Sequence, residues 1–446
     1  MRTPPKPARI LAAAAVAVTM TACVNQAAPV QATTAPAVAA PQIPDTPAGR
    51  QLRWVLDVVG RAPVPDAELG GHFTADFLKS VPPAQLNQVL AAFKGLRFDR
   101  LTQSQDRSVV ARVAVGKVPY DLSLTVDGAG LVNGLLFRSP TPKDWAELDR
   151  RLAGIAPRQG FLTAELTSGG KCRPLHATAS GKARPLGSMF KLYVLGAVAK
   201  SVKSGAFGWD TQLTITPELK SLPSGELQDR PDGSKVTVLE AAKLMISISD
   251  NTATDLLVHK VGRKAVERTM RAWGVDDRRN VPLLTTRDLF VLKGADYPRH
   301  ARRYLSLSEG RQRAYLESVL AKVPLSQVKA WAKPRELDTI EWFATPAQVC
   351  RAYAGLVELG DKRIAEVMSV NDAGLGLDKA LWPEVWFKGG SEPGVVDMGF
   401  LARTAEGRTY VTIALAIDPK EPFPAMHAES ELLALARGAF GLVKGS

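Results

Sequence analysis

The chain has 446 residues, of which 46% are hydrophobic and 23% charged, a balance normal for a soluble globular protein with room for two domains. Its net charge is +13, but Lys and Arg are scattered and no nucleic-acid-binding module is recognisable. We therefore expect no nucleic-acid partner and only a general attraction to an anionic membrane or cell wall. The five histidines form no metal-ligand spacing, so we predict no metal site and no other cofactor.

The first residues have the pattern of an export signal. Basic residues precede an apolar run, from Ile10 to Met20, that is too short to span a bilayer. Small residues then lead directly to Cys23, which resembles a bacterial lipobox, where the cysteine becomes the lipidated first residue. We expect residues 1–22 to be a lipoprotein signal peptide and Cys23 to carry a membrane anchor. The alternative is an ordinary cleaved signal followed by an incidental cysteine.

Two segments with different compositions follow. Residues 23–45 are rich in Ala, Pro, Thr and Gln without apolar periodicity, which is typical of a flexible linker. Residues 46–140 predict a small α+β domain, because helical stripes of apolar residues give way to alternation between Val109 and Phe137. Helices followed by a curled antiparallel sheet suggest a cone resembling that of ketosteroid isomerases. No acid–base pair is evident in it, so a structural or partner-binding role is favoured.

Residues 146–446 predict a second domain, beyond a proline-rich boundary at Ser139 to Pro142. A helix and a strand open this domain, and a strand hairpin with a helix closes it. Terminal strands and helices that enclose a long helical middle indicate an α/β sandwich. Two cysteines, Cys172 and Cys350, could pair in an oxidising compartment, but the sequence does not show whether they do.

A Ser-x-x-Lys motif occurs three times, and its context separates the copies. Ser168 lies in a Gly-Gly hairpin turn, and Ser326 has no partner motif downstream. Ser188 opens a strongly apolar helix, on which residues three apart share a face, so Lys191 can reach the Ser188 hydroxyl. The positive end of the helix stabilises an oxyanion and, together with burial, disfavours the ammonium form of Lys191. This lysine can therefore act as a neutral base.

Two further motifs follow in chain order, Ser249-Asp250-Asn251 and Lys388-Gly389-Gly390-Ser391. The first stands at a predicted helix start, and the second precedes the terminal strand hairpin. Each motif alone is weak. Ser-x-x-Lys, Ser-Asp-Asn and Lys-x-Gly in this order are the signature of the penicillin-recognising serine enzymes. Over residues 146–446 the chain resembles the class A β-lactamases, and the resemblance implies the β-lactamase/transpeptidase type of α/β sandwich.

The resemblance implies four catalytic residues. Ser188 attacks the substrate carbonyl, and Lys191 takes its proton. Ser249 passes a proton to the leaving group, and Lys388 supplies positive charge opposite Ser249.

The resemblance also implies a substrate-binding set. Asn251 contacts the ligand or Lys191, and Gly390 and Ser391 lie along the substrate. Backbone amides of Ser188 and Ser391 form the oxyanion hole, whereas Asp250 braces its loop. An isomerase-like cone joined to this domain resembles the LpqF-type lipoproteins and a protein of the clavulanic acid pathway. That architecture implies hydrolase or esterase chemistry more than efficient antibiotic destruction.

Two features depart from the class A pattern. Those enzymes carry a Glu-x-x-x-Asn loop between the second and third motifs, whose Glu activates the water that clears the acyl-enzyme, and this chain has no clear match. Glu336 and Glu341 are the nearest candidates, although glutamates at surface turns are usually solvated. Gly389 stands where the family has Ser or Thr, a hydroxyl that helps to hold a β-lactam carboxylate. Ser391 could compensate for it.

Together these patterns predict a serine hydrolase that forms an acyl-enzyme on Ser188. It would act on ester or β-lactam and amide carbonyls, as a slow β-lactamase with esterase activity. The rivals are a genuine class A β-lactamase that hydrolyses antibiotics and a non-catalytic binding lipoprotein of the cell envelope. The chain keeps Ser188, Lys191, Ser249 and Lys388, which argues against the second rival. Buried charges without a role would be costly. We expect a bacterial, exported monomer, anchored through Cys23 to the outer face of the plasma membrane, whose partner is a small-molecule substrate.

Overall fold

The protein is described by a computed structural model over residues 42–116, 118–423 and 427–444, without the side chains of His427 and Lys444. The predicted signal peptide, Cys23 and nearly all of the predicted linker lie outside these residues. Within the part of the chain that is described, no helix is both long enough and apolar enough to cross a membrane.

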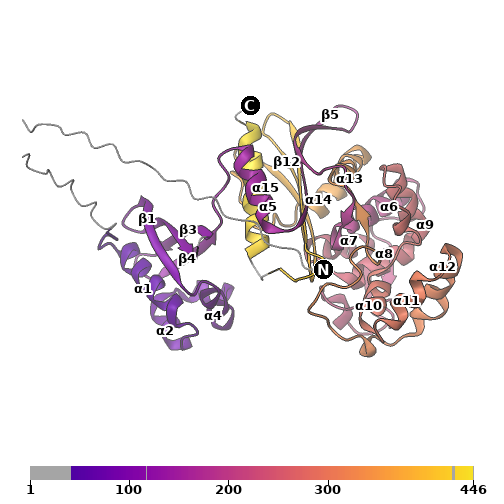
Figure 1. The fold of residues 1–446 in the computed structure, drawn as a ribbon, viewed down its shortest axis with the longest axis horizontal. Helices are drawn as coiled ribbons and strands as arrows, with labels where there is room; N and C mark the ends of the chain where they lie inside the picture. The colour runs from indigo at the N-terminus through magenta and orange to yellow at the C-terminus, as the bar shows by residue number, and fades with distance from the viewer. Residues whose placement is uncertain (1–41, 117, 424–426, 445–446) are drawn as a thin grey trace, which may run out of the picture. The chain divides into compact units, whose positions relative to one another are not determined.

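Residues 47–138 form an α+β domain around a four-stranded antiparallel sheet in the order β1-β2-β3-β4. Helix α1 packs against β1, β2 and β3 and buries one apolar stripe, which includes Leu52, Val55 and Val58. Figure 1 shows this helix and the sheet in one domain. The elements are α1 (Pro47–Arg61), α2 (Asp66–His72), α3 (Ala75–Ser80), α4 (Pro83–Ala92), β1 (Leu96–Ser104), β2 (Ser108–Val115), β3 (Val118–Val126) and β4 (Val132–Arg138). Strand β2 alternates buried and half-buried residues, as expected when one face of a sheet packs on a core.

A five-stranded antiparallel sheet, in the order β11-β12-β13-β5-β6, is the centre of the second domain. Strands that are far apart in the sequence meet in it, because β13 pairs with β5 along the whole length of β13. Its strands are β5 (Arg158–Thr167), β6 (Lys171–Thr178), β11 (Glu384–Glu392), β12 (Val395–Arg403) and β13 (Thr409–Ile417). Two short two-stranded sheets pair β7 (Arg184–Pro185) with β10 (Phe343–Ala344), and β8 (Gln212–Thr214) with β9 (Lys235–Thr237).

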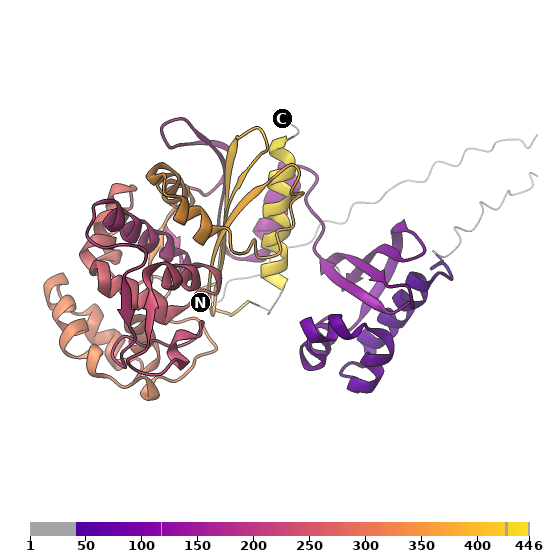
Figure 2. The ribbon, with the colours of Figure 1, turned by 180° about the vertical axis from the view of Figure 1, so that it is seen from behind.

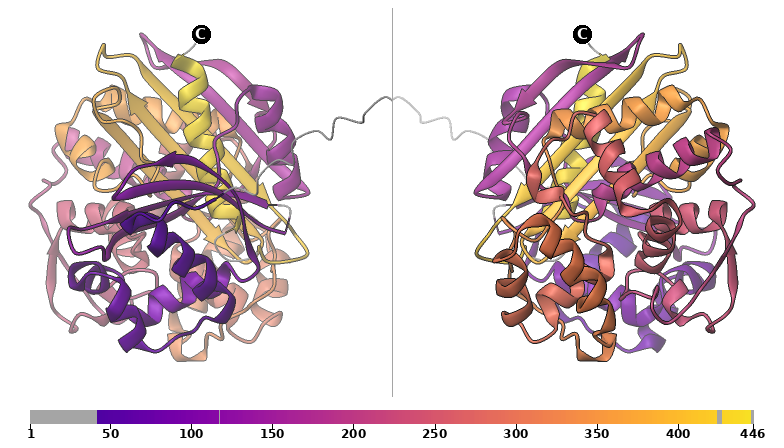
Figure 3. Two further views of the ribbon diagram at one scale, coloured as in Figure 1. Left: turned by 90° about the vertical axis from the view of Figure 1, so that its left-hand side faces the viewer. Right: turned by 90° about the vertical axis from the view of Figure 1, so that its right-hand side faces the viewer.

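Helices cover both faces of this sheet (Figure 3). The terminal helices α5 (Trp145–Ile155) and α15 (His427–Lys444) pack together on one face, and α13 (Pro346–Leu359) packs on the other. Residues of β13 alternate between the two sides: Ile413 belongs to the α13 core, whereas Ala414 belongs to the α15 core. Burial of both faces explains why this strand is a continuous apolar run.

The helical middle of the domain lies on the α13 side of the sheet (Figures 1 and 2). It consists of the 3-10 helix η1 (Gly187–Phe190), α6 (Lys191–Lys203), η2 (Leu227–Asp229), α7 (Val238–Ser247), α8 (Asn251–Val261), α9 (Arg263–Ala272), η3 (Arg278–Asn280), α10 (Thr286–Gly294), α11 (Arg299–Leu305), α12 (Glu309–Ser318), η4 (Leu320–Lys322), η5 (Leu325–Gln327), α13 and α14 (Lys362–Met368). Helix α6 runs through the core, with nine consecutive buried residues from Lys191 to Ala199.

The predicted fold class is confirmed: an α/β sandwich of the β-lactamase/transpeptidase type follows a small α+β domain. The similarity of the first domain to ketosteroid isomerases stays a prediction. Cys172 on β6 and Cys350 on α13, whose pairing the sequence left open, are joined by a disulfide. This bond ties the edge of the sheet to the helix that covers it.

Candidate active site

Ser188 lies in the 3-10 turn that leads into α6. A backbone hydrogen bond holds the residue before this turn, because the Leu186 N–H donates to the Trp342 carbonyl at 2.8 Å. Gly187 adopts the left-handed region, with φ of 46°, which only glycine does readily. Met189 and Phe190 are completely buried, whereas Ser188 is half-buried, so the turn exposes the serine and buries its neighbours.

Strand β11 runs directly against this turn. A Cβ atom on Gly390 would lie 2.1 Å from the Leu186 carbonyl oxygen and 2.9 Å from the Ser188 nitrogen, so only glycine fits here. A Cβ on Gly187 would lie 3.1 Å from the Ser391 nitrogen. The contact between these two glycines therefore brings the backbone amides of Ser188 and Ser391 into one neighbourhood, as an oxyanion hole requires.

Lys191 is the centre of the site, and its side chain is completely buried. Its Nζ donates to the Ser249 carbonyl at 2.6 Å and to Asn251 Oδ1 at 2.7 Å, and it lies 3.1 Å from Ser249 Oγ. Burial lowers the pKa of Lys191 well below its usual value, and the nearby positive charge of Lys388 lowers it further. An amine that has already donated two hydrogens can still accept a proton when it is neutral.

Ser249 connects the two lysines of the site. Its Oγ lies 3.1 Å from Lys191 Nζ and 3.1 Å from Lys388 Nζ. Its φ of 58° is unusual for a residue with a side chain, and such strain is often found at functional sites. Lys388 also donates to the Gly389 carbonyl at 2.6 Å, and burial lowers its pKa to about 7.

The loop before α8 is held by Asp250. Its carboxylate accepts the N–H groups of Ala253 at 2.8 Å, Glu226 at 2.7 Å and Leu227 at 2.9 Å. Asn251 in turn donates to the Leu222 carbonyl at 3.0 Å, which leaves its Oδ1 for Lys191. Asp250 therefore braces the loop that positions Ser249 and Asn251.

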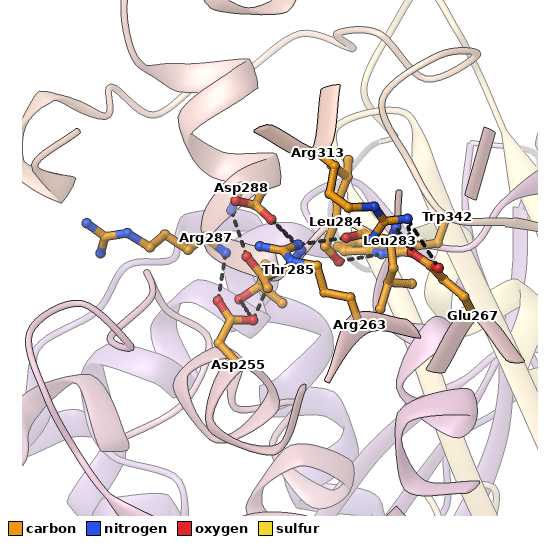
Figure 4. A network of polar contacts seen from close by, with 11 residues as sticks. Asp255, Arg263, Glu267, Leu283, Leu284, Thr285, Arg287, Asp288, Arg313 and Trp342 are labelled. Atoms are coloured by element: carbon orange, nitrogen blue, oxygen red, sulfur yellow. Dashed lines mark hydrogen bonds and ion pairs between the residues drawn. The ribbon is translucent and has the colours of Figure 1, made fainter. Parts of the chain in front are cut away.

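A second polar network holds the start of α10 beside this loop (Figure 4). Asp255 accepts the Thr286 N–H at 2.8 Å and the Arg287 N–H at 2.9 Å. The Thr286 hydroxyl also lies 3.2 Å from the Asn251 carbonyl. Desolvation raises the pKa of Asp255 to about 6 despite these hydrogen bonds. Asp288 is paired with Arg263. Helices α8, α9 and α10 are thus fixed to one another behind the site.

The two glutamates that the sequence offered as water activators lie in different surroundings. Glu336 is half-buried and accepts the Thr339 hydroxyl at 2.7 Å. Glu341 is 1% exposed, lines the same cavity as Ser188, and forms an ion pair with Lys293 at 2.9 Å. Burial alone would raise the pKa of Glu341, but the attraction of Lys293 outweighs burial and holds the pKa below its usual value.

The sequence analysis missed Lys293 and Glu392. Lys293 Nζ also pairs with Glu392 at 2.7 Å, and Glu392 directly follows Ser391. Burial raises the pKa of Glu392 well above its usual value, against the attraction of Lys293. One signal was present: Lys293 directly follows an apolar run on α10, where an unpaired charge would be costly.

The structure brings together all seven predicted site residues that it describes: Ser188, Lys191, Ser249, Asn251, Lys388, Gly390 and Ser391. Six of them line one cavity. Lys191 is not among the lining residues, but it contacts two of them, Ser249 and Asn251. The other two Ser-x-x-Lys motifs, at Ser168 and Ser326, lie on the β5–β6 turn and on η5, outside this set. In the described ranges, no group of three or more His, Cys, Asp or Glu residues could hold a metal ion.

Two stretches of the chain match known families. Residues 148–309 match the β-lactamase enzyme family. The chain carries a β-lactamase-family domain. This match contains the Ser188 and Ser249 motifs and supports a serine hydrolase-type enzyme. Residues 43–132 match a separate family, described as the ORF 12 gene product N-terminal domain. No curated protein matches the chain in sequence.

Several solved structures are similar to the chain. A β-lactamase from Sphaerobacter thermophilus DSM 20745 is 20% identical with a TM-score of 0.47, and the match covers 68% of this chain and 97% of that one. The structure of PBP-A is 17% identical with a TM-score of 0.46, over 69% of this chain and 100% of that one. A class A β-lactamase from Mycobacterium abscessus is 15% identical with a TM-score of 0.45, over 68% and 99%.

Proposed function

We propose that this chain is an acyl-transfer serine hydrolase that forms an acyl-enzyme on Ser188 and turns over esters better than β-lactams. The observation that carries the proposal is the environment of Lys191. Its amine is buried beside three oxygen atoms, and no carboxylate of the described residues forms an ion pair with it. A buried amine without a carboxylate in contact favours its neutral form, which is the form that a general base requires.

The acylation step uses groups that lie within one cluster. Lys191 Nζ takes the proton of Ser188 Oγ as that oxygen forms a bond to the substrate carbonyl carbon. The carbonyl oxygen becomes an oxyanion, which the amides of Ser188 and Ser391 stabilise. When the bond to the leaving oxygen breaks, the proton returns from Lys191 through Ser249 Oγ to that oxygen, across the 3.1 Å contact. Lys191 is then neutral again.

Deacylation is the slower step for β-lactams in this proposal. A water must attack the acyl carbonyl and give up a proton, and the motif that supplies a glutamate for this step in class A enzymes has no clear match here. Of the two candidate glutamates, Glu336 and Glu341, only Glu341 is among the residues that line the cavity. Its ion pair with Lys293 lowers its basicity. Gly389 offers no hydroxyl to a carboxylate. Small activated esters, whose acyl groups leave room for water, should turn over faster than cephalosporins.

We further propose that the protein is exported and lipid-anchored through Cys23, as an LpqF-type lipoprotein. The Cys172–Cys350 disulfide supports export, because such bonds persist in oxidising compartments. The match of residues 43–132 to a family of its own supports a two-domain relative of the clavulanic-pathway protein. Partition into detergent tests the anchor: Cys23→Ser should release the protein or block its processing, and equal partition of both forms would refute lipidation.

A fluorophosphonate probe with intact-mass analysis tests the nucleophile. One probe should add per chain, and Ser188→Ala should abolish the adduct. Ser201→Ala is a matched control on the same helix, because Ser201 only donates to the Ala197 carbonyl there. Persistent labelling of Ser188→Ala would refute the assignment, and an unlabelled wild-type chain would favour the non-catalytic binding protein.

Stopped-flow kinetics with a chromogenic cephalosporin test the slow step. The proposal expects slow acylation and an adduct that accumulates. Rapid steady-state turnover without an adduct would indicate a genuine β-lactamase. In that case Glu341→Gln would show whether this residue activates the water.

A further inference from the structure

An apolar wall lines the same cavity as Ser188. It consists of Leu289 and Phe290 on α10, Val328 and Trp331 in the segment after η5, and Trp342 next to β10. We refer to these five residues as the apolar wall. Leu289 and Trp342 are buried, and the other three are half-buried, so the wall is not closed over by the rest of its own domain. An apolar surface kept open inside a cavity is suited to an apolar ligand group.

The apolar wall is attached to the catalytic elements at several points. Trp342 stacks on Phe190, two residues after the nucleophile, with ring centroids 3.7 Å apart and planes 4° apart. Its indole donates to the Leu284 carbonyl at 3.0 Å, as part of the network that fixes the start of α10 (Figure 4). The wall therefore stands at a fixed place relative to Ser188.

The segment that carries Trp331 is packed onto the end of α10. A Cβ on Gly294 would lie 2.4 Å from Val328 Cγ1, and the Lys329 N–H donates to the Gly294 carbonyl at 3.0 Å. The ring of Trp331 lies 6.0 Å from the ring of Phe290. This contact joins two chain segments into one continuous surface.

The charged groups beside the wall already pair with one another. Glu341 and Glu392 line the same cavity and share Lys293 as their ion-pair partner. Lys388 is already held by Ser249 Oγ and the Gly389 carbonyl. Ser249, which connects the two lysines, gives the proton to the leaving alcohol and so lies on the alcohol side of the substrate. The apolar wall belongs to other elements, so we assign it to the part of the substrate that stays on Ser188.

We propose that the physiological substrate is an uncharged ester with a large apolar acyl group, which the wall of Leu289, Phe290, Val328, Trp331 and Trp342 receives. The inference rests on the proposed serine hydrolase and goes beyond it, because it commits to the substrate class. The acyl chain transfers to Ser188 Oγ, the alcohol leaves with the proton from Ser249, and water then releases the carboxylic acid. Each methylene buried against the wall should raise kcat/KM about fourfold until the wall is covered.

Two series of esters, assayed with the full chain, test the proposal. In the first, 4-nitrophenyl esters carry acyl chains of increasing length. In the second, acetyl esters carry aryl alcohols of increasing size but similar acidity. The value of kcat/KM should rise steeply with the length of the acyl chain and change little with the size of the alcohol. A flat response to the acyl chain, or a steeper response to the alcohol, would overturn the assignment.

Variants of Trp331 test whether the wall causes the selectivity. Trp331→Ala should flatten the dependence on acyl length, and Trp331→Phe should keep it. Leu381→Ala removes an apolar side chain that is 39% exposed outside the cavity and should change nothing. If folded Trp331→Ala kept the dependence on acyl length while Ser188 still reacted with the fluorophosphonate, the substrate inference would be overturned and the proposed function would stand. Loss of that reaction in the wild-type chain would instead refute the proposed function.

Discussion

Lys191 and Lys293 are both completely buried in the same domain, yet their surroundings differ in one respect. Lys191 contacts a carbonyl, a hydroxyl and an amide oxygen, whereas Lys293 contacts the carboxylates of Glu341 and Glu392. Burial lowers the pKa of Lys191 well below its usual value. Burial also opposes the charge of Lys293, but the two carboxylates outweigh it and raise the pKa.

The comparison separates two uses of a buried lysine. An ammonium with carboxylate partners compensates part of its desolvation and stays charged, so it holds elements together. An amine with neutral oxygen partners is held in position by hydrogen bonds, but burial favours its neutral form, so it can accept a proton. The counter-charge, rather than burial, therefore distinguishes the structural lysine from the candidate base.

The largest expected effect is on acylation by Lys191→Ala. Removal of a general base typically lowers the rate about 10²–10⁴-fold, and we expect a loss of that size in the acylation rate constant measured by stopped flow. Lys203→Ala is the control, because this exposed lysine lies on the same helix and outside the site. A rate within a few-fold of wild type would mean that another group deprotonates Ser188.

The second prediction concerns the stability of the chain. Lys293→Met leaves two buried carboxyl groups without a cation, so the free energy of unfolding measured in urea should fall by about 3–5 kcal/mol. Lys191→Met breaks no ion pair and should cost less. Glu341→Gln added to Lys293→Met should restore part of the loss. If both lysine variants lost the same stability, the distinction between the two sites would fail.

The third prediction is a pH profile of kcat/KM, which reports the free enzyme. Activity should rise with pH as Lys191 loses its proton. It should fall again, approaching tenfold per pH unit, above the pKa of Lys388 at about 7, because the neutral amine no longer supplies positive charge. Lys388→Arg keeps its charge at higher pH and should remove the alkaline fall. Persistence of that fall in Lys388→Arg would assign it to another group.

The smallest expected effect is on the helix that carries Lys293. Thr285 caps α10 by accepting the Asp288 N–H at 3.1 Å, so Thr285→Ala should lower the free energy of unfolding by about 1 kcal/mol. Thr345→Ala removes the equivalent cap of α13 and should cost a similar amount. Neither variant should change the acylation rate, because neither hydroxyl contacts the Lys191 cluster. A marked loss in Thr285→Ala would show that α10 controls the base.

The sequence predicted which residues lie together at the candidate site better than it predicted the residues that support them. Ser188 and Lys191 are one helical turn apart, so their proximity follows from local structure, and the order of the three motifs predicted that Ser249 and Lys388 would join them. The Lys293–Glu341–Glu392 cluster could not be predicted, since its members lie on separate elements and form no motif. Local patterns do not specify which charges meet in a folded core.

The charge state of Lys191 is the most direct test of the central claim. Lysine labelled with ¹³C at Cε, assigned with Lys191→Arg and Lys293→Arg, reports by NMR the protonation of each amine across a pH titration. We predict that Lys191 is neutral at pH values where surface lysines and Lys293 remain ammonium. If the Lys191 resonance titrated with the surface lysines, this residue would be a structural cation, and the proposed mechanism of acylation would be wrong.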